Sequence, residues 1–179
     1  NRTVDLNAIK DRIFTKDHQQ VALETAQKGI VLLKNKGLLP LKKTNSRNRI
    51  LVTGPNANNQ TILGDWHAPQ PDENVTTIFE GLKKVGDQNG YEVEFFDSGE
   101  NIRKIKDTAI AMAAKKAAAV DYAVVVVGDN AMRYRWKDKT SGENMGRAAL
   151  DLPGKQLDLV KAIKAVSYTH LRAHETPLY

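Results

Sequence analysis

Glu143 is the side chain in this sequence that best fits a proton donor in catalysis. It lies between Gly142 and Asn144 in a long polar segment, and Arg147 follows four residues later. A general acid working near neutral pH needs a carboxyl group that stays protonated and still reaches a leaving group, and a loop that buries it when substrate arrives supplies both. From composition and placement alone, the commoner role is a surface Glu paired with a nearby Arg or Lys.

Two other residues of this segment are candidates for contact with a polar ligand. Asp129 directly follows an apolar run, where its usual role is turn formation through side-chain to backbone hydrogen bonds. Trp136 lies between two basic residues and could stack on a sugar face, but packing over the base of the loop fits equally well. Both alternatives stay open for each residue.

The sequence gives little support for a metal site, a nucleotide-binding site or a nucleophilic triad. Asp65, Trp66 and His67 form a polar cluster, but a His beside a Trp is more often structural or exposed than a base, and no Ser or Cys motif completes a triad. The sequence has no cysteine, no HExxH motif and no carboxylate cluster, so no metal site is expected. The turn GPNANN at 54–59 matches neither GxGxxG nor GxxxxGK[ST], so no cofactor is expected.

The candidate residues sit in a connection that regular elements must position. The segment from Asp121 to Leu152 begins with an apolar strand, continues through a polar stretch containing Arg133 and Arg135, and leads to a helix opened by Pro153 and Gly154. Connections longer than about 12 residues are uncommon in compact domains unless they bind something or are disordered.

Strands and helices are expected to alternate along the rest of the chain. Four helices are predicted: one from Asp17 with an apolar face that extends to Leu33, one after a cap at Thr76 or Thr77, one over 102–120 and one after Pro153. Three strands are predicted, over 49–53, 91–96 and 122–127. This alternation predicts an α/β fold, a three-layer α/β/α sandwich with a mainly parallel sheet that is incomplete at the C-terminus. Ligands of such sheets collect at the carboxyl ends of the strands.

Composition and charge give a globular chain with two atypical ends. The 179 residues are 41% hydrophobic and 27% charged, and the net charge of +6 is scattered without interleaved aromatics, so neither nucleic acid nor a membrane is expected as a partner. Residues 1–16 are interpreted as a linker from something upstream. Residues 167–179, SYTHLRAHETPLY, are interpreted as a sequencing-adapter artefact and set aside.

Six blocks of this chain resemble glycoside hydrolase family 3, in the α/β sandwich that follows the catalytic barrel of β-glucosidases and β-xylosidases. They are ALETAQKGIVLLKNKGLLPL (22–41), ILVTGPNAN (50–58), LGDW (63–66), NVTTIFEGLK (74–83), VVVVGDN (124–130) and GENMGRAALDLPGKQ (142–156). The resemblance implies that 17–166 are a partial C-terminal domain of this family, and that 1–16 arrive from a missing N-terminal (β/α)8 barrel.

The resemblance also implies roles for individual residues. Glu143 occupies the position of the family's general acid/base, and Arg147 occupies the position of an Arg in the same family motif. Gly146 stands where the family usually has Asp. Arg147, Trp136 and Asp129 are then candidates for substrate binding.

The implied function is part of a retaining β-glycoside hydrolase, β-glucosidase-like, that acts on terminal non-reducing β-D-glycosyl residues. Its partners would be a β-linked oligosaccharide or aryl β-glycoside and its own barrel, which supplies the nucleophile, so the chain alone should be inactive. The alternatives are a β-xylosidase of the same family and a non-catalytic sugar-binding or domain-packing module. A periplasmic or secreted location agrees with the resemblance, and the sequence leaves the compartment open.

Overall fold

The computed structural model describes residues 5–9, 11–43, 48–68, 70–131, 135–167 and 170–171, so Arg133 and most of the tail lie outside the described residues. The chain divides into two compact units, residues 1–33 and residues 34–179. Within the described residues, no helix has the length and apolarity needed to cross a bilayer.

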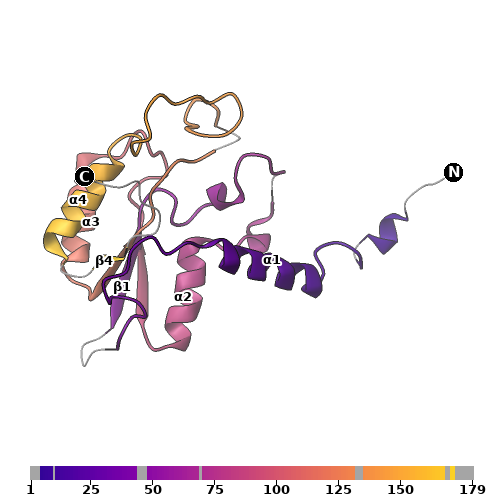
Figure 1. Cartoon of the computed structure of the whole chain (residues 1–179), viewed down its shortest axis with the longest axis horizontal. Coiled ribbons are helices and arrows are strands. Elements are labelled where there is room, and N and C mark those ends of the chain that lie inside the picture. Colours follow the sequence, from indigo (N-terminus) through magenta and orange to yellow (C-terminus); the bar gives the residue numbers. More distant parts are fainter. Residues whose placement is uncertain are drawn as a thin grey trace. The chain divides into compact units, whose positions relative to one another are not determined.

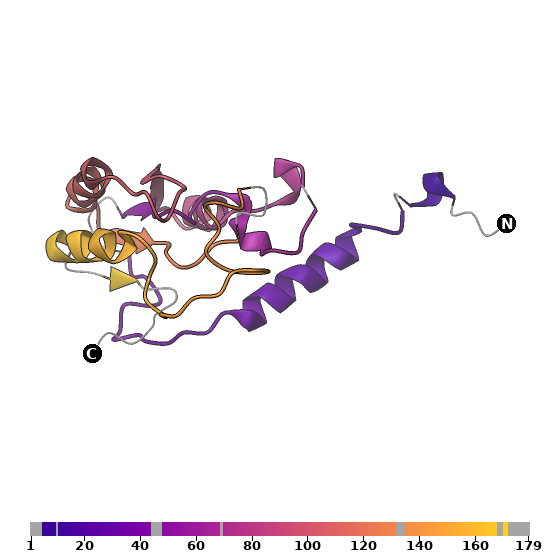
Figure 2. The same cartoon turned by 90° about the horizontal axis from the view of Figure 1, so that it is seen from above.

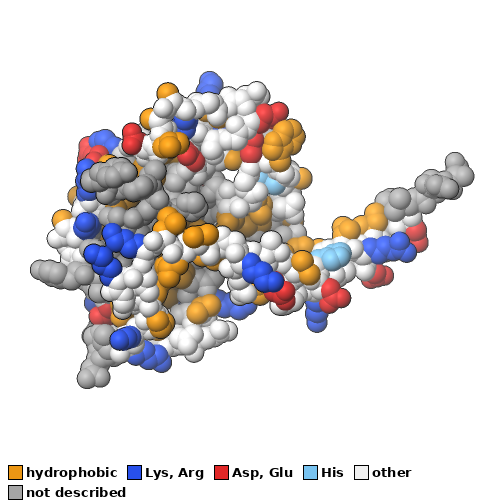
Figure 3. All heavy atoms as spheres, viewed as in Figure 1, with side chains coloured by type: hydrophobic (Ala, Val, Ile, Leu, Met, Phe, Trp, Pro, Cys, Tyr) orange, Lys and Arg blue, Asp and Glu red, His pale blue; other side chains and the backbone are white. Residues whose placement is uncertain are grey.

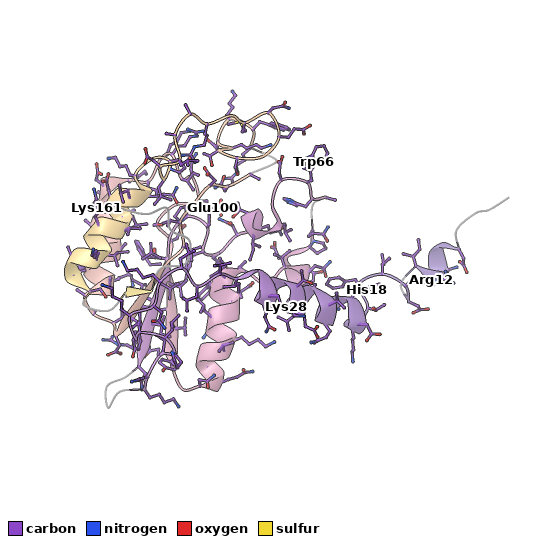
Figure 4. The ribbon with its side chains drawn as sticks, viewed as in Figure 1. Arg12, His18, Lys28, Trp66, Glu100 and Lys161 are labelled. Carbon is purple, nitrogen blue, oxygen red and sulfur yellow. The ribbon has the colours of Figure 1, made fainter. Side chains whose placement is uncertain are left out.

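The first unit contains a short 3-10 helix, Leu6–Ala8, and helix α1, Lys16–Gly29. The predicted cap was Asp17, but Thr15 caps α1 and its side chain accepts a hydrogen bond from the amide of His18. Ile30 is already extended, so the predicted helical face is cut short after Gly29. The β-branched residues Ile30 and Val31 follow Gly29 in the sequence. Glycine and β-branched residues both have a lower helix propensity than alanine, so the helix ends here. His18 and Lys28 are exposed on α1 (Figure 4).

The second unit is built on a parallel sheet. Its strands are β1 (Arg49–Thr53), β2 (Glu92–Phe96), β3 (Tyr122–Val125) and the two-residue β4 (His170–Leu171), in the order β2-β1-β3-β4. All three pairings are parallel. The first three strands match the predicted ones to within two residues. β4 lies in the segment that the sequence analysis set aside.

Helices cover both faces of this sheet, as Figures 1 and 2 show. Helix α2 (Ile78–Gln88) lies on one face, and α3 (Asp107–Ala117) and α4 (Gln156–Val166) lie side by side on the other. Each face has its own core: Ile50, Val52, Val93, Tyr122 and Val124 face α2, whereas Leu51 and Ala123 pack with Ile110, Ala113, Leu159 and Ile163. The predicted three-layer α/β/α class is confirmed.

Two helix boundaries differ from the predicted ones. Helix α3 begins at Asp107 rather than at Ile102, although Ile102 and Ile105 are buried at a spacing that resembles a helical turn. Helix α4 begins at Gln156, after Lys155, rather than at Pro153. By contrast, α2 has the expected start, because Thr77 and Glu80 form a reciprocal capping box.

Basic side chains on the face shown in Figure 3 are spread over several elements and do not gather in one groove.

Candidate functional site

The segment 135–155 lies across the carboxyl ends of the three longer strands. Thr140 and Ser141 donate their backbone N–H groups to the carbonyl of Asn130, just beyond β3, at 3.0 and 3.2 Å. Arg135 forms an ion pair with Glu100, which follows β2, at 3.3 Å. Parallel strands place their carboxyl ends at one edge, so this segment is held at the edge where ligands of such sheets bind.

A buried ion pair joins this segment to the loop after β1. Lys139 Nζ lies 2.8 Å from Asp65 Oδ1, and the Lys139 side chain is 0% exposed while that of Asp65 is 8% exposed. Lys139 Nζ also donates to the carbonyl of Glu143 at 3.0 Å and lies 4.3 Å from the ring centre of Trp136. The ammonium group therefore contacts a carboxylate, a carbonyl and an aromatic face.

Glu143 is fixed through its backbone. Its N–H donates to Asp65 Oδ2 at 2.7 Å, so the two carboxylate oxygens of Asp65 bind Lys139 and the Glu143 amide. The Glu143 side chain is exposed, and within the described residues its carboxylate has no hydrogen-bond or ion-pair partner. The structure thus combines a positioned main chain with an available carboxylate.

Backbone conformation restricts the residues around Glu143. Gly142 has a φ of +91°, and a Cβ built there would lie 2.6 Å from the Asp65 carboxyl carbon. Asn144 also has a positive φ, +60°. A glycine before Glu143 is therefore required both by the left-handed conformation and by the approach of Asp65.

Arg147 does not pair with Glu143. Its guanidinium forms an ion pair with Asp129 and donates to the carbonyl of Asp151. Asp129 and Arg147, both predicted to contact substrate, are thus brought together at the end of β3, where they neutralise each other. Asn56, in the turn after β1, donates to the carbonyl of Asp129 at 3.2 Å.

The residues that follow anchor α4 to β3. Gln156 is fully buried, accepts from the N–H of Gly128 and donates to the carbonyl of Gly128, both at 2.9 Å. A Cβ on Gly154, whose φ is +66°, would lie 2.2 Å from the carbonyl oxygen of Ile102. These contacts explain the need for Gly at 154 and for Gln at 156.

Aromatic side chains are exposed near this edge. Trp136 is 51% exposed and Trp66 is 74% exposed; Figure 4 shows Trp66 on the outer side of the segment after β1. Trp136 is near Glu143 through Lys139, so the structure brings these two candidates together. His67 Nδ1 lies 2.7 Å from the carbonyl of Gly64, a contact within its own loop.

A pocket of about 550 Å³ opens beside these contacts, between β1 and β3. Most of its lining residues are apolar, and its polar ones are Asn56, Thr61, Asp129 and Asp151. Glu143 is not among the described residues that line it. The pocket lies where the chain passes from one side of β1 to the other, which is the usual ligand position in open α/β sheets.

A hydrogen bond from Asn101, together with Lys104 at 3.4 Å, lowers the pKa of Asp138, so the Asp138 carboxylate is ionised at neutral pH. Among the described residues, no group of three or more His, Asp or Glu side chains could hold a metal ion.

The fold and this edge define an α/β/α domain that presents a carboxylate on a fixed loop, and comparison with known proteins identifies its family. The sequence model of the glycosyl hydrolase family 3 C-terminal domain matches residues 30–170. The chain belongs to this family.

Relatives and solved structures agree with this assignment. A probable β-D-xylosidase 6 of Arabidopsis thaliana is 35% identical over 87% of this chain and 18% of its own length. A periplasmic β-glucosidase of Salmonella typhimurium is 30% identical over 83% of this chain and 21% of its own. A crystallised β-glucosidase of Listeria innocua in complex with laminaribiose shares the fold, with a TM-score of 0.73 and 24% identity over 92% of this chain and 21% of its own. The chain thus spans about a fifth of these relatives.

Proposed function

We propose that this chain is the acid/base-bearing domain of a retaining β-glycoside hydrolase and that Glu143 is the acid/base. The observation that carries the proposal is an exposed Glu143 carboxylate on a loop whose backbone is fixed at the carboxyl edge of the sheet. Membership of the family supports the reaction class.

The second carboxylate of the site is placed outside this chain. A retaining glycosidase needs a nucleophile about 5–5.5 Å from the acid/base. We place that residue, an Asp, in a barrel domain joined to this chain through residues 1–16. The exposed position of Glu143 supports this division, because a partner domain can approach it.

The reaction then has two steps. In the first, Glu143 protonates the glycosidic oxygen while the barrel Asp attacks the anomeric carbon and the aglycone leaves. In the second, Glu143 takes a proton from water, which attacks the glycosyl enzyme and releases the sugar with its configuration retained. The other candidates take supporting roles: Trp136 offers a ring face for a sugar, Asp129 offers its polar atoms at the pocket, and Arg147, which is paired with Asp129, offers its remaining N–H groups beside it.

The sugar is a terminal β-D-glucosyl or β-D-xylosyl residue. The Arabidopsis relative is named a β-D-xylosidase and the Salmonella relative a β-glucosidase, with 35% and 30% identity to this chain. β-Xylosidase activity is therefore the second candidate. A non-catalytic packing domain is the competing class, and the following experiment separates it from both.

Replacement of Glu143 by Gln in the full-length protein tests the proposal. General acid catalysis contributes about 10²–10⁴-fold, so we expect kcat/KM for phenyl β-glucoside or β-xyloside to fall by that factor. The dinitrophenyl glycoside needs little protonation of its leaving group, and its kcat/KM should change less than about tenfold. Glu92→Gln, at the exposed amino end of β2, is the control and should behave like the parent. An unchanged rate of Glu143→Gln on the phenyl glycosides would reject the assigned role.

A further inference from the structure

The buried pair of Asp65 and Lys139 joins two segments that are 74 positions apart in the sequence. Asp65 follows β1, and Lys139 belongs to the segment that carries Glu143. Both side chains are almost completely removed from solvent. Burial of two charges costs several kcal/mol per ion before their attraction is counted, so the contacts made by the other polar atoms of the pair matter for its stability.

The remaining polar atoms of this pair are directed at Glu143. The second oxygen of Asp65 accepts the Glu143 N–H at 2.7 Å, and the Lys139 ammonium donates to the Glu143 carbonyl at 3.0 Å. One ion pair therefore fixes the amide before Glu143 and the amide after it. The direction of the Glu143 Cα–Cβ bond depends on these two peptide planes.

Neighbouring contacts restrict the pair itself. Gly142 brings its backbone against the Asp65 carboxylate, where a Cβ would lie at 2.6 Å. Arg103 donates to the carbonyl of Lys139 at 3.3 Å, and the Trp136 ring covers the ammonium group. Lys139 is thus fixed at two places: Arg103 binds its backbone carbonyl, and Asp65 and the Trp136 ring contact its ammonium group.

We infer that Asp65 and Lys139 are positioning residues for the acid/base: the pair sets the place of Glu143 at the carboxyl edge of the sheet. The inference rests on the proposed function of Glu143. Neither residue touches the glycosidic oxygen in this account. A catalytic group displaced by about 1 Å loses rate about 100-fold, so the loss of the pair should appear in the proton-transfer step.

Asp65→Asn and Lys139→Met in the full-length protein test this inference. Asn keeps the shape of Asp and one oxygen acceptor, and it is the milder variant if Lys139→Met does not fold. We expect each variant to lower kcat/KM for the phenyl glycoside about 10- to 100-fold and to leave that for the dinitrophenyl glycoside within about threefold, with KM changed little. Lys137→Met, an exposed lysine two residues away, is the matched control.

Amide hydrogen exchange provides a readout that does not depend on catalysis. The Glu143 N–H should exchange at least about tenfold faster in Asp65→Asn than in the parent, because its acceptor loses charge. The double variant Asp65→Asn/Lys139→Met should lose no more kcat/KM for the phenyl glycoside than the worse single variant, because both residues act through one ion pair.

The outcomes separate the two proposals. Equal losses on phenyl and dinitrophenyl glycosides, or unchanged exchange at Glu143, would overturn the positioning role. Faster exchange of the Glu143 N–H in Asp65→Asn together with full activity of Glu143→Gln would instead overturn the assignment of Glu143 as the acid/base. The Asp65–Lys139 pair would then position the loop without a role in catalysis.

Discussion

At the residue scale, the loop around Glu143 divides its polar groups between contacts that fix the backbone and one carboxylate that remains exposed. Asp65 and Lys139 provide the fixed contacts, and Arg147 is occupied by Asp129. Of the basic residues that could pair with a surface Glu143, Arg147 is paired with Asp129 instead. An available carboxylate is what a proton donor requires before a partner domain covers it.

Gly142 provides a residue-scale test of this arrangement. Replacing it by Ala puts a side chain on a backbone with φ of +91° and against the Asp65 carboxylate. We expect the free energy of unfolding of the chain to fall by about 1–3 kcal/mol in urea titrations. Gly146→Ala is the matched control, because no atom lies within 4 Å of its built Cβ, and it should stay within about 0.5 kcal/mol of the parent. Equal effects of the two variants would contradict the described loop conformation.

Part of the site could be predicted from the sequence, and part could not. Glu143, Asp129 and Arg147 stand out because they lie in or beside a polar segment after a buried strand. Lys139 does not, because Lys137, Asp138 and Lys139 together resemble a solvated surface turn, and its partner Asp65 is 74 positions away. Within one sequence, no local pattern distinguishes a buried lysine from its exposed neighbour Lys137. The glycine at 142 is the one local signal that this loop approaches another segment closely.

At the element scale, strands were predicted better than helix ends. The unbroken run of alanine and valine at 123–127 is typical of a central strand that is buried on both faces. The predicted helix is longer than α3 because Ile102 and Ile105 are buried without being helical: the Ile102 backbone lies against Gly154 in the turn before α4, and Ile105 packs in the core formed with α3 and α4. Periodicity shows which residues are buried, but the packing partner decides the backbone conformation.

Helix α2 permits a prediction at the element scale. The sequence leaves Thr76 and Thr77 as alternative caps, and the structure has Thr77 as the cap. The Thr77 hydroxyl accepts a hydrogen bond from the Glu80 N–H, and the Thr77 N–H donates to the Glu80 carboxylate. Thr77→Ala should lower the free energy of unfolding by about 1 kcal/mol in urea titrations. Thr76→Ala should be close to neutral because Thr76 is exposed outside the capping box. A larger loss from Thr76→Ala would show that the cap is misassigned.

At the scale of the whole molecule, the sheet order explains why distant segments form one site. The chain passes from β1 to β2 on one side and returns to β3 on the other side of β1. The turns after β1 and β3 therefore meet at one edge, where Asp65 and Lys139 join them and the pocket opens. The chain spans about a fifth of its relatives' length, and we propose that it supplies one side of a site that a barrel completes.

Chemical rescue tests the central claim about Glu143 most directly. Glu143→Gly in the full-length protein removes the acid/base and leaves room for a small anion. With a dinitrophenyl β-glycoside as substrate, we expect slow release of sugar in water, and we expect added azide to restore turnover and give the β-glycosyl azide, because azide attacks the glycosyl enzyme without a general base. Parental turnover of Glu143→Gly in water, or a slow variant that azide neither accelerates nor converts to a β-azide product, would contradict the account.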